Sequence, residues 1–325
     1  MRRLDLQVID QALRWSKQGH PLWLCTVLAT FGSSPREPGA MLVACQDGEH
    51  LGSLSGGCVE EDFLDRLRQG EFAKPVQQVR YGGQGNESAA RRVQLPCGGS
   101  LDILVERLEP SVSTVAYLEM FHATLLGQQS LIRRIPLDGR AAYFDPNESP
   151  GPTILQEDGI VGVRVGPALR LIIAGISPVS EACASFASTL GFEVIVCDPR
   201  EELCRSFAVP GVDVVAMLPS SFILSGGCHA ATAVVALTHD PRIDDLAMIE
   251  AVRTEAFYIG VMGSRKTSQQ RAVRLQRSGG LSAEQVGRIA MPIGLGLGSK
   301  TPSEIALAVM ADIVRVHRGQ PRDAL

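Results

Sequence analysis

The segment 258–266, of sequence YIGVMGSRK, combines groups that together can bind an anion. Its apolar start has the length of a strand and ends abruptly at Gly263, and a helical pattern follows. In such a passage from strand to helix, free backbone N–H groups and the helix dipole point to one place. Ser264, Arg265 and Lys266 add a hydroxyl and two cations there. Open α/β sheets bind ligands at the carboxyl ends of their strands, so we predict an anion site rather than a plain turn with solvated basic residues.

Two of the eight cysteines stand beside paired glycines, in the sequences SGGCVEED (55–62) and PCGG (96–99). Paired glycines let the backbone approach a ligand closely. Cys58 also opens a predicted helix, where the pKa of a thiol is depressed, and thiolates suit soft metals and sulfur-bearing ligands. The simpler interpretation is a tight turn with a buried cysteine, but the pattern occurs twice and favours a shared site lined by both thiols. Neither spacing dictates a metal. The candidate residues of this site are Gly56, Gly57, Cys58, Glu60, Cys97, Gly98 and Gly99.

The predicted strand 169–174 and the strand after it carry part of a dinucleotide-binding pattern. That pattern needs GxGxxG after the first strand and an acidic residue about 20 positions further on. Asp198 is placed correctly, but of the three glycines only Gly175 is present. The Ser177 side chain would crowd a pyrophosphate and Pro178 lacks an amide donor. Ordinary NAD binding is therefore disfavoured, whereas a ligand with a different phosphate placement fits.

Two other stretches are candidates for the ligand edge. His239 and Asp240 follow a predicted strand over 233–237 and form either an acid–base or orienting pair or a strand-end cap. The glycine-rich stretch 294–300 lacks the GxxxxGK[ST] spacing of a P-loop, so we interpret it as a loop near the ligand edge.

The elements that must position these residues divide the chain in two. In the first part, helices are predicted over 4–18, 59–69 and 112–127, and strands over 22–30, 41–45, 101–105 and 130–135. We interpret residues 110–165 as a connecting module, with a turn-dense stretch at 146–152. From residue 168, strands and helices alternate as in a doubly wound parallel sheet. We predict an α/β protein with a mixed N-terminal module over 1–165 and a Rossmann-like domain over 166–325.

Composition and charge exclude several classes of protein. The 325 residues suffice for two domains, and 45% hydrophobic with 20% charged residues describes a globular protein. A net charge of -4 argues against a nucleic-acid binder. The sequence contains no apolar run of 18 residues and no signal-peptide core at its start, so we expect a cytoplasmic location and no membrane contact. The cysteines form no CxxC pair, so their spacing does not support a zinc site.

The joint occurrence of these motifs resembles the XdhC/CoxI family, the accessory proteins of xanthine dehydrogenase and related molybdenum hydroxylases. The matching stretches run through nearly the whole chain: SGGCVEED at 55–62, PCGG at 96–99, CDPRE at 197–201, THD at 238–240, YIGVMGSRK at 258–266 and PIGLGLGSKTPSEIALAVMADI at 292–313. The chain departs from the family at the first Rossmann turn, where many relatives look like GAGHV and this sequence has GISPV at 175–179.

The resemblance implies a molybdenum cofactor-binding chaperone rather than an enzyme with catalytic residues of its own. Such a protein holds molybdopterin or its cytosine dinucleotide form and supports sulfuration of the cofactor by a cysteine desulfurase. It then inserts the cofactor into the apoenzyme of a molybdenum hydroxylase. The phosphate end of the cofactor suits Gly263, Ser264, Arg265 and Lys266, and its metal end suits Cys58 and Cys97. Gly175, Asp198, His239 and Asp240 complete the candidate cofactor-binding set, and a two-fold homodimer is expected.

Two other classes of function compete with this interpretation. An NAD(P)-dependent oxidoreductase would use the Rossmann-like sheet, but the altered turn at Gly175 and the lack of a catalytic Tyr/Lys or Cys/His arrangement argue against it. A sulfurtransferase would carry a persulfide on Cys58 or Cys97.

Overall fold

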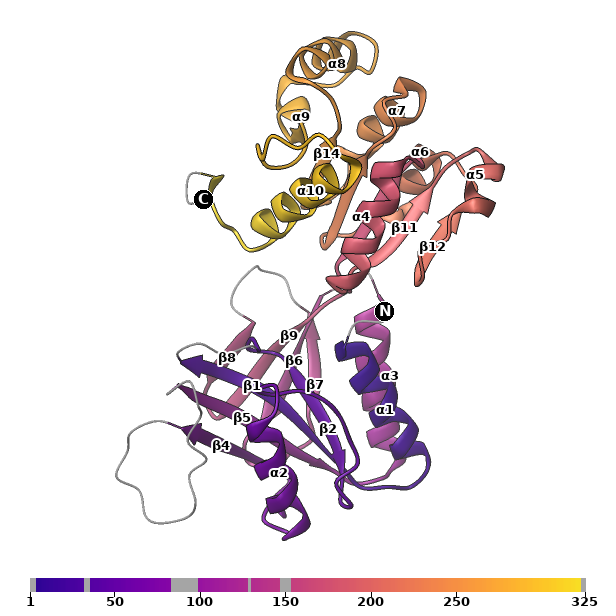
Figure 1. The fold of residues 1–325 in the computed structure, drawn as a ribbon. Coiled ribbons are helices and arrows are strands. Elements are labelled where there is room, and N and C mark those ends of the chain that lie inside the picture. Colours follow the sequence, from indigo (N-terminus) through magenta and orange to yellow (C-terminus); the bar gives the residue numbers. More distant parts are fainter. Residues whose placement is uncertain (1–3, 32–35, 83–98, 128–129, 147–152, 323–325) are drawn as a thin grey trace. The chain divides into compact units, whose positions relative to one another are not determined.

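The computed structural model describes residues 4–31, 36–82, 99–127, 130–146 and 153–322. The chain forms two compact units, one over residues 4–167 and one that begins at residue 168. Both units combine helices with sheets, which confirms the predicted α/β class (Figure 1). In the described ranges, no helix is long and apolar enough to cross a membrane.

The unit formed by residues 4–167 contains two antiparallel sheets, with strand orders β3-β2-β1-β5-β4 and β7-β6-β9-β8. Its elements are α1 (Leu4–Lys17), β1 (Leu22–Phe31), β2 (Met41–Cys45), β3 (His50–Gly52), α2 (Cys58–Arg68), β4 (Val76–Gly82), β5 (Ser100–Leu108), α3 (Val112–Leu126), β6 (Leu131–Pro136), β7 (Tyr143–Pro146), β8 (Ile154–Glu157) and β9 (Ile160–Val165).

The central strand β1 is buried on both faces because its alternate residues face two different cores. Trp23, Cys25 and Val27 pack in one core with α2, whereas Leu22 and Leu24 pack in another with α1 and α3. The helix predicted over 112–127 and the strand predicted over 130–135 are present as α3 and β6. Residues 110–165, interpreted from the sequence as a connecting module, lie within the first compact unit. They form α3, which packs against α1, and the second sheet, which packs against the first through a further core.

The unit that begins at residue 168 is built on a parallel sheet with strand order β12-β11-β10-β13-β14-β15. Its elements are β10 (Arg170–Ala174), α4 (Pro178–Thr189), β11 (Glu193–Cys197), α5 (Glu201–Ser206), β12 (Val212–Val215), α6 (Pro219–Phe222), η1 (Ile223–Gly227), β13 (Thr232–Ala236), α7 (Pro241–Ala251), β14 (Tyr258–Val261), α8 (Arg265–Arg277), α9 (Ala283–Gly287), β15 (Ile289–Ala290) and α10 (Pro302–His317). Counted from β10, the order is 3-2-1-4-5-6, which is the Rossmann order. This confirms the predicted doubly wound sheet.

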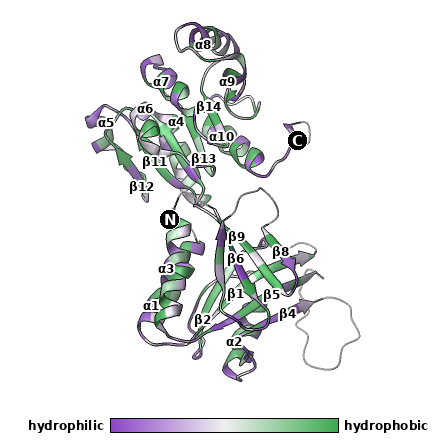
Figure 2. Ribbon diagram, turned by 180° about the vertical axis from the view of Figure 1, so that it is seen from behind, coloured by the Kyte–Doolittle hydropathy of each residue, from purple (hydrophilic) through white to green (hydrophobic). Residues whose placement is uncertain are grey.

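Helices cover both faces of this sheet. One core joins the strands to α4 and α10, and the other joins them to η1, α7, α8 and α9. Figure 2 shows the hydrophobic colouring of the strands between these helix layers. Because both faces are covered, a ligand can reach the sheet only at its edges and ends, and the carboxyl ends of the strands carry the candidate residues.

Candidate functional site

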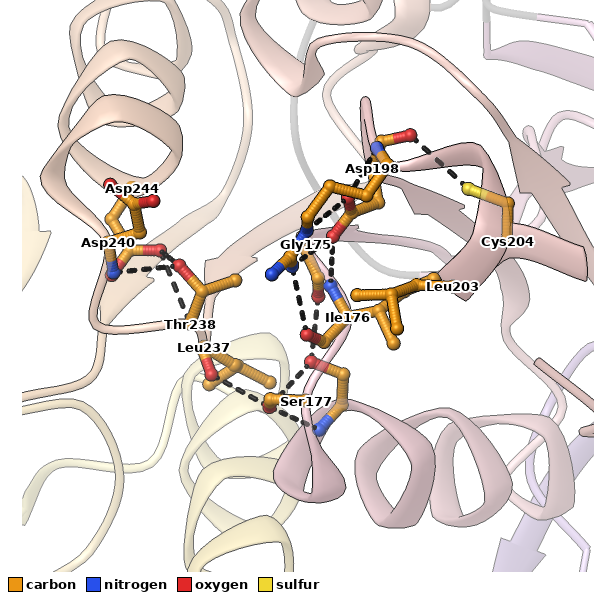
Figure 3. Close-up of polar contacts among 12 residues, drawn as sticks. Gly175, Ile176, Ser177, Asp198, Leu203, Cys204, Leu237, Thr238, Asp240 and Asp244 are labelled. Carbon is orange, nitrogen blue, oxygen red and sulfur yellow. Dashed lines mark hydrogen bonds and ion pairs between the residues drawn. The ribbon is translucent and has the colours of Figure 1, made fainter. Parts of the chain in front are cut away.

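The order in which the chain adds strands reverses between β10 and β13. Open α/β folds bind ligands at such a point, in a crevice outside the carboxyl ends of the strands. Gly175 follows β10 with φ +85°, a backbone conformation that other residues adopt only with strain. A Cβ atom at this position would overlap the Thr238 methyl group that follows β13. Ser177 Oγ donates to Leu237 O at 2.8 Å, so side chains of the protein itself close the crevice at the first turn (Figure 3).

Asp198 lies after β11 and is fully buried. Its Oδ2 accepts hydrogen bonds from Ile176 N (2.7 Å) and Arg200 Nη2 (2.6 Å), and its Oδ1 accepts from Arg200 N and Nε (both 2.8 Å). Burial opposes ionisation of this carboxyl, but the hydrogen bonds from Arg200 and Ile176 outweigh it and lower its pKa. Groups of the chain therefore occupy both oxygens, which in a dinucleotide-binding domain would accept the ribose hydroxyls.

His239 and Asp240 do not form the predicted acid–base pair in this structure. Asp240 is the N-cap of α7, and its carboxylate accepts from the backbone and guanidinium of Arg242. These hydrogen bonds lower the pKa of Asp240 to about 2. His239 is exposed and has a left-handed backbone, φ +68°, which a non-glycine residue keeps only when its surroundings impose it. The sequence also allowed a strand-end cap at these residues; Asp240 caps the helix that follows, and the exposed imidazole of His239 can meet a ligand.

Residues 258–266 have the strand, turn and helix that their sequence predicts. Ser264 caps α8, and its Oγ accepts from Thr267 N at 3.1 Å. The first helical amides, those of Arg265 and Lys266, have no carbonyl partner within the helix. Both side chains are exposed. The arrangement thus presents two amides and two cations at the carboxyl end of β14, which is the composition of an anion site.

Arg271 connects the loops after β13 and β14 and was not recognised in the sequence. Its guanidinium is 1% exposed and donates to Met262 O (2.8 Å), Asp245 Oδ1 (2.8 Å) and Asp244 Oδ2 (3.3 Å). Asp244 in turn accepts from Thr238 Oγ1 (2.7 Å) and His239 N (3.0 Å). This network holds His239 in its strained conformation and fixes the turn that leads to the anion site. The one sign of this role in the sequence is that Arg271 falls on the buried face of a helix whose other residues are mostly polar or basic.

In the N-terminal unit, Glu60 organises the loop that precedes Cys58. Its carboxylate is largely buried and accepts from the backbone N–H groups of residues 54, 55, 56 and 57 and from the hydroxyls of Ser53 and Ser55, at 2.6–3.0 Å. Burial alone would raise the pKa of Glu60, but the hydrogen bonds from Ser55, Ser53 and Gly56 lower it well below its usual range. Glu60 therefore shapes the loop, and its own carboxylate fills the nest of amides that an external anion could have occupied.

The thiol site predicted around this loop is described only in part. Gly56 and Gly57 have φ values of +93° and +156°, and a Cβ at Gly57 would meet open space, so backbone is accessible next to the start of α2. Cys58 is the first residue of α2. Cys97 and Gly98 lie outside the described residues, and Gly99 directly precedes β5. A site shared by Cys58 and Cys97 stays a prediction. In the described ranges, no three His, Cys, Asp or Glu side chains are grouped to hold a metal ion.

Comparison with known proteins places this architecture in a family. The model described as the XdhC and CoxI family matches residues 15–82, and the XdhC Rossmann domain matches residues 171–313. The chain belongs to the XdhC and CoxI family. It is 28% identical to the molybdenum cofactor insertion chaperone PaoD of Escherichia coli, over 93% of this chain and 85% of that protein. It is 26% identical to a probable xanthine dehydrogenase subunit of Bacillus subtilis, over 91% and 93% of the two chains.

A solved structure shares the fold of this XdhC and CoxI family member. The crystal structure titled as a xanthine dehydrogenase from Bacillus halodurans aligns with a TM-score of 0.73 and 22% identity, over 100% of this chain and 98% of the other. At this identity the likeness concerns the fold alone.

The close approach of Thr238 to Gly175 predicts a specific response to substitution. Gly175→Ala should lower the free energy of unfolding of the C-terminal unit by about 3–4 kcal/mol, because it adds overpacking of about 1–3 kcal/mol to the strain of a positive φ. Gly191→Ala is the matched control, since its φ is +84° and a Cβ there meets open space. That control should cost only about 1–2 kcal/mol.

The measurement is urea unfolding followed by circular dichroism. Both tryptophans, Trp15 and Trp23, lie in the N-terminal unit, so their fluorescence provides an internal reference that should not move. Adding Thr238→Ser removes the overlapping methyl and should recover part of the loss in the Gly175→Ala background. Equal costs at Gly175 and Gly191 would contradict the close packing.

The Glu60 hydrogen bonds predict a pH-dependent loop. In Glu60→Gln, amide exchange at residues 54–57 should accelerate tenfold or more at pH 7, because hydrogen bonds to a charged group contribute about 1.5–3 kcal/mol each. The folded-state pKa of Glu60 is lowered, so its contribution is complete above the unfolded-state pKa of about 4.3 and is lost as the pH falls through the folded value. The difference between the two proteins should therefore shrink only below about pH 4. Hydrogen exchange read by mass spectrometry checks both expectations, and Glu61→Gln serves as the control.

Proposed function

We propose that this protein is a molybdenum cofactor-binding chaperone that holds the cofactor and inserts it into a molybdenum hydroxylase of the xanthine dehydrogenase or aldehyde oxidase type. The observation that carries the proposal is the anion site at 263–266, on a Rossmann sheet whose dinucleotide features are occupied by the chain itself. The relative named as a molybdenum cofactor insertion chaperone supports it, since that likeness extends over 93% of the chain.

The molybdenum cofactor is a pterin dithiolene that ends in a phosphate or a dinucleotide tail, and it is cargo here. Its phosphate suits Arg265 and Lys266 with the amides at the start of α8. Gly263 fits there as well, because the turn before Ser264 must bring the backbone close to the phosphate. His239, exposed at the neighbouring strand end, adds a polar contact. The metal end suits the thiols of Cys58 and Cys97, which remain candidates.

The finer parts of the proposal are supported only by the resemblance to the family. A cysteine desulfurase supplies sulfur while the cofactor is held, and the apoenzyme of the hydroxylase receives it. The tail of the cofactor is either a simple phosphate or a cytosine dinucleotide, and the chaperone works in the cytoplasm, as a homodimer. Persulfide transfer through Cys58 or Cys97 is the competing version, and a mass increase of one sulfur atom after incubation with a desulfurase would favour it.

The test is equilibrium binding of molybdenum cofactor to the full chain, with NAD(H) titrated in parallel. Molybdenum is read by elemental analysis and the pterin by fluorescence of its oxidised derivative. We expect stoichiometric pterin, no NAD(H) response, and at least tenfold weaker retention in Arg265→Ala/Lys266→Ala, because the variant loses both cations that face the phosphate.

The matched control is Arg253→Ala/Arg277→Ala, which also removes two positive charges but near the C-terminal ends of α7 and α8. It should retain the cofactor as the unmodified chain does. NAD(H) binding without pterin would refute the proposed chaperone function and would support an NAD(P)-dependent dehydrogenase. Equal losses in both double variants would show that net charge, and not the site at 263–266, governs binding.

A further inference from the structure

The loop after β11 is where Rossmann domains distinguish the ribose ends of their nucleotides. An acidic residue there accepts hydrogen bonds from a free ribose diol, whereas an arginine there binds a phosphate on the ribose. This chain has both groups, Asp198 at the end of the strand and Arg200 two residues later. The contacts between them decide which group is available to a ligand.

Asp198 has no capacity left for a ligand. Its side chain is completely buried and each of its oxygens already accepts two hydrogen bonds, from Ile176 and Arg200. A diol could bind only if it displaced a charged, bidentate contact, which is among the stronger hydrogen-bonded pairs in proteins. Asp198 therefore positions Arg200 and does not bind a ribose.

Arg200 retains both charge and access. Its side chain is 47% exposed, and its contacts to Asp198 and Ile176 O use only Nε and Nη2. No described residue accepts from Nη1. Asp198 holds the guanidinium plane in place at one edge, so a ligand would meet a pre-oriented cation rather than a flexible one.

The surroundings of Arg200 leave room for a ligand, and their charges are mixed. An open hollow in the surface is lined by Arg200, Glu201, Glu202, Leu203 and Arg205. Its carboxylates are partly compensated, since Glu201 pairs with Arg205 at 2.6 Å. Across the strand ends, Asp240 is near enough to influence Arg200 but is itself paired with Arg242 at 2.8 Å.

We infer that Arg200, held by Asp198, is a phosphate-binding subsite that replaces the diol-binding acid of a dinucleotide fold. The strand order β11-β10-β13-β14 separates it from the start of α8 by three strand spacings, about 14 Å, so it is distinct from the site at 263–266. It takes a phosphate monoester or diphosphate and discriminates against a nucleotide end with a free diol. This subsite stands on its own contacts and does not require that the molybdenum cofactor binds.

The test is calorimetric titration of the full chain in the Arg265→Ala/Lys266→Ala background, so that the other anion site does not contribute. The probes are inorganic pyrophosphate for a terminal diphosphate, 2′-AMP for a phosphate on the ribose, and adenosine for the free diol. We expect binding of one or both phosphate probes and none of adenosine. The stronger phosphate probe identifies the source of the group.

Two substitutions should weaken phosphate binding to different extents. Arg200→Gln should weaken phosphate binding about tenfold, with partial retention in Arg200→Lys, because the cation is lost or reshaped. Asp198→Asn should weaken phosphate binding only about threefold, because it keeps an oxygen for Ile176 N and leaves the cation present, but no longer holds the guanidinium in place. Arg277→Gln, at the end of α8, is the neutral control. Thermal unfolding of each variant verifies the fold.

A merely structural ion pair gives a different result. In that case Asp198→Asn and Arg200→Gln would weaken binding equally, or neither would change it, and the inference would be overturned. Absence of binding by either phosphate probe would overturn it as well. If Arg200→Gln fails to fold, the partial retention of phosphate binding in Arg200→Lys decides alone. Loss of cofactor binding in Arg265→Ala/Lys266→Ala with phosphate binding intact at Arg200 would separate this subsite from the proposed function.

Discussion

The candidate site depends on one buried guanidinium. Arg271 lies on the covered face of α8 and joins the carbonyl of Met262 to the carboxylates of Asp244 and Asp245. Burying a charge in this way is favourable only because every contact partner is itself fixed, and removing one partner would leave an uncompensated charge in the core. The same contacts position the turns after two neighbouring strands, so stability and the shape of the ligand edge have a common cause.

The carboxyl edge of the sheet shows how a Rossmann domain can lose one ligand and keep another. The amide of Ile176 and the Asp198 carboxylate, which a dinucleotide would use, bond to each other. What remains available is positive: the start of α8 with Arg265 and Lys266, and the exposed guanidinium of Arg200. A site of this composition favours phosphate over ribose, which agrees with a cargo that carries a phosphate on a pterin.

Local features of the site were predictable from the sequence because neighbouring residues determine them. The apolar run before Gly263 and the helical pattern after it predicted strand, turn and helix, which the structure confirms. Of the four-stranded sheet only β6 was predicted, as the strand over 130–135. Its other strands were missed because they are short and have no strong period-two pattern.

Features that depend on distant partners could not be predicted in this way. Arg271 and Asp244 are 27 positions apart, so only the fold shows that they meet. Arg200 and Asp198 are close in sequence, but which group serves the ligand depends on how the two side chains bond. For the same reason, the sequence that predicted Asp198 as a ligand contact could not show that Ile176 and Arg200 already occupy both of its carboxylate oxygens.

The most direct test of the account is hydrogen exchange of the full chain with and without bound molybdenum cofactor, read at peptide resolution by mass spectrometry. The account predicts that the cofactor slows exchange at residues 263–268 and, through Arg271, also at residues 238–244. Replacement of Arg271 by Met should uncouple the two segments. Protection confined to residues 54–60, or absent from the C-terminal unit, would contradict the claim that this sheet edge holds the cofactor.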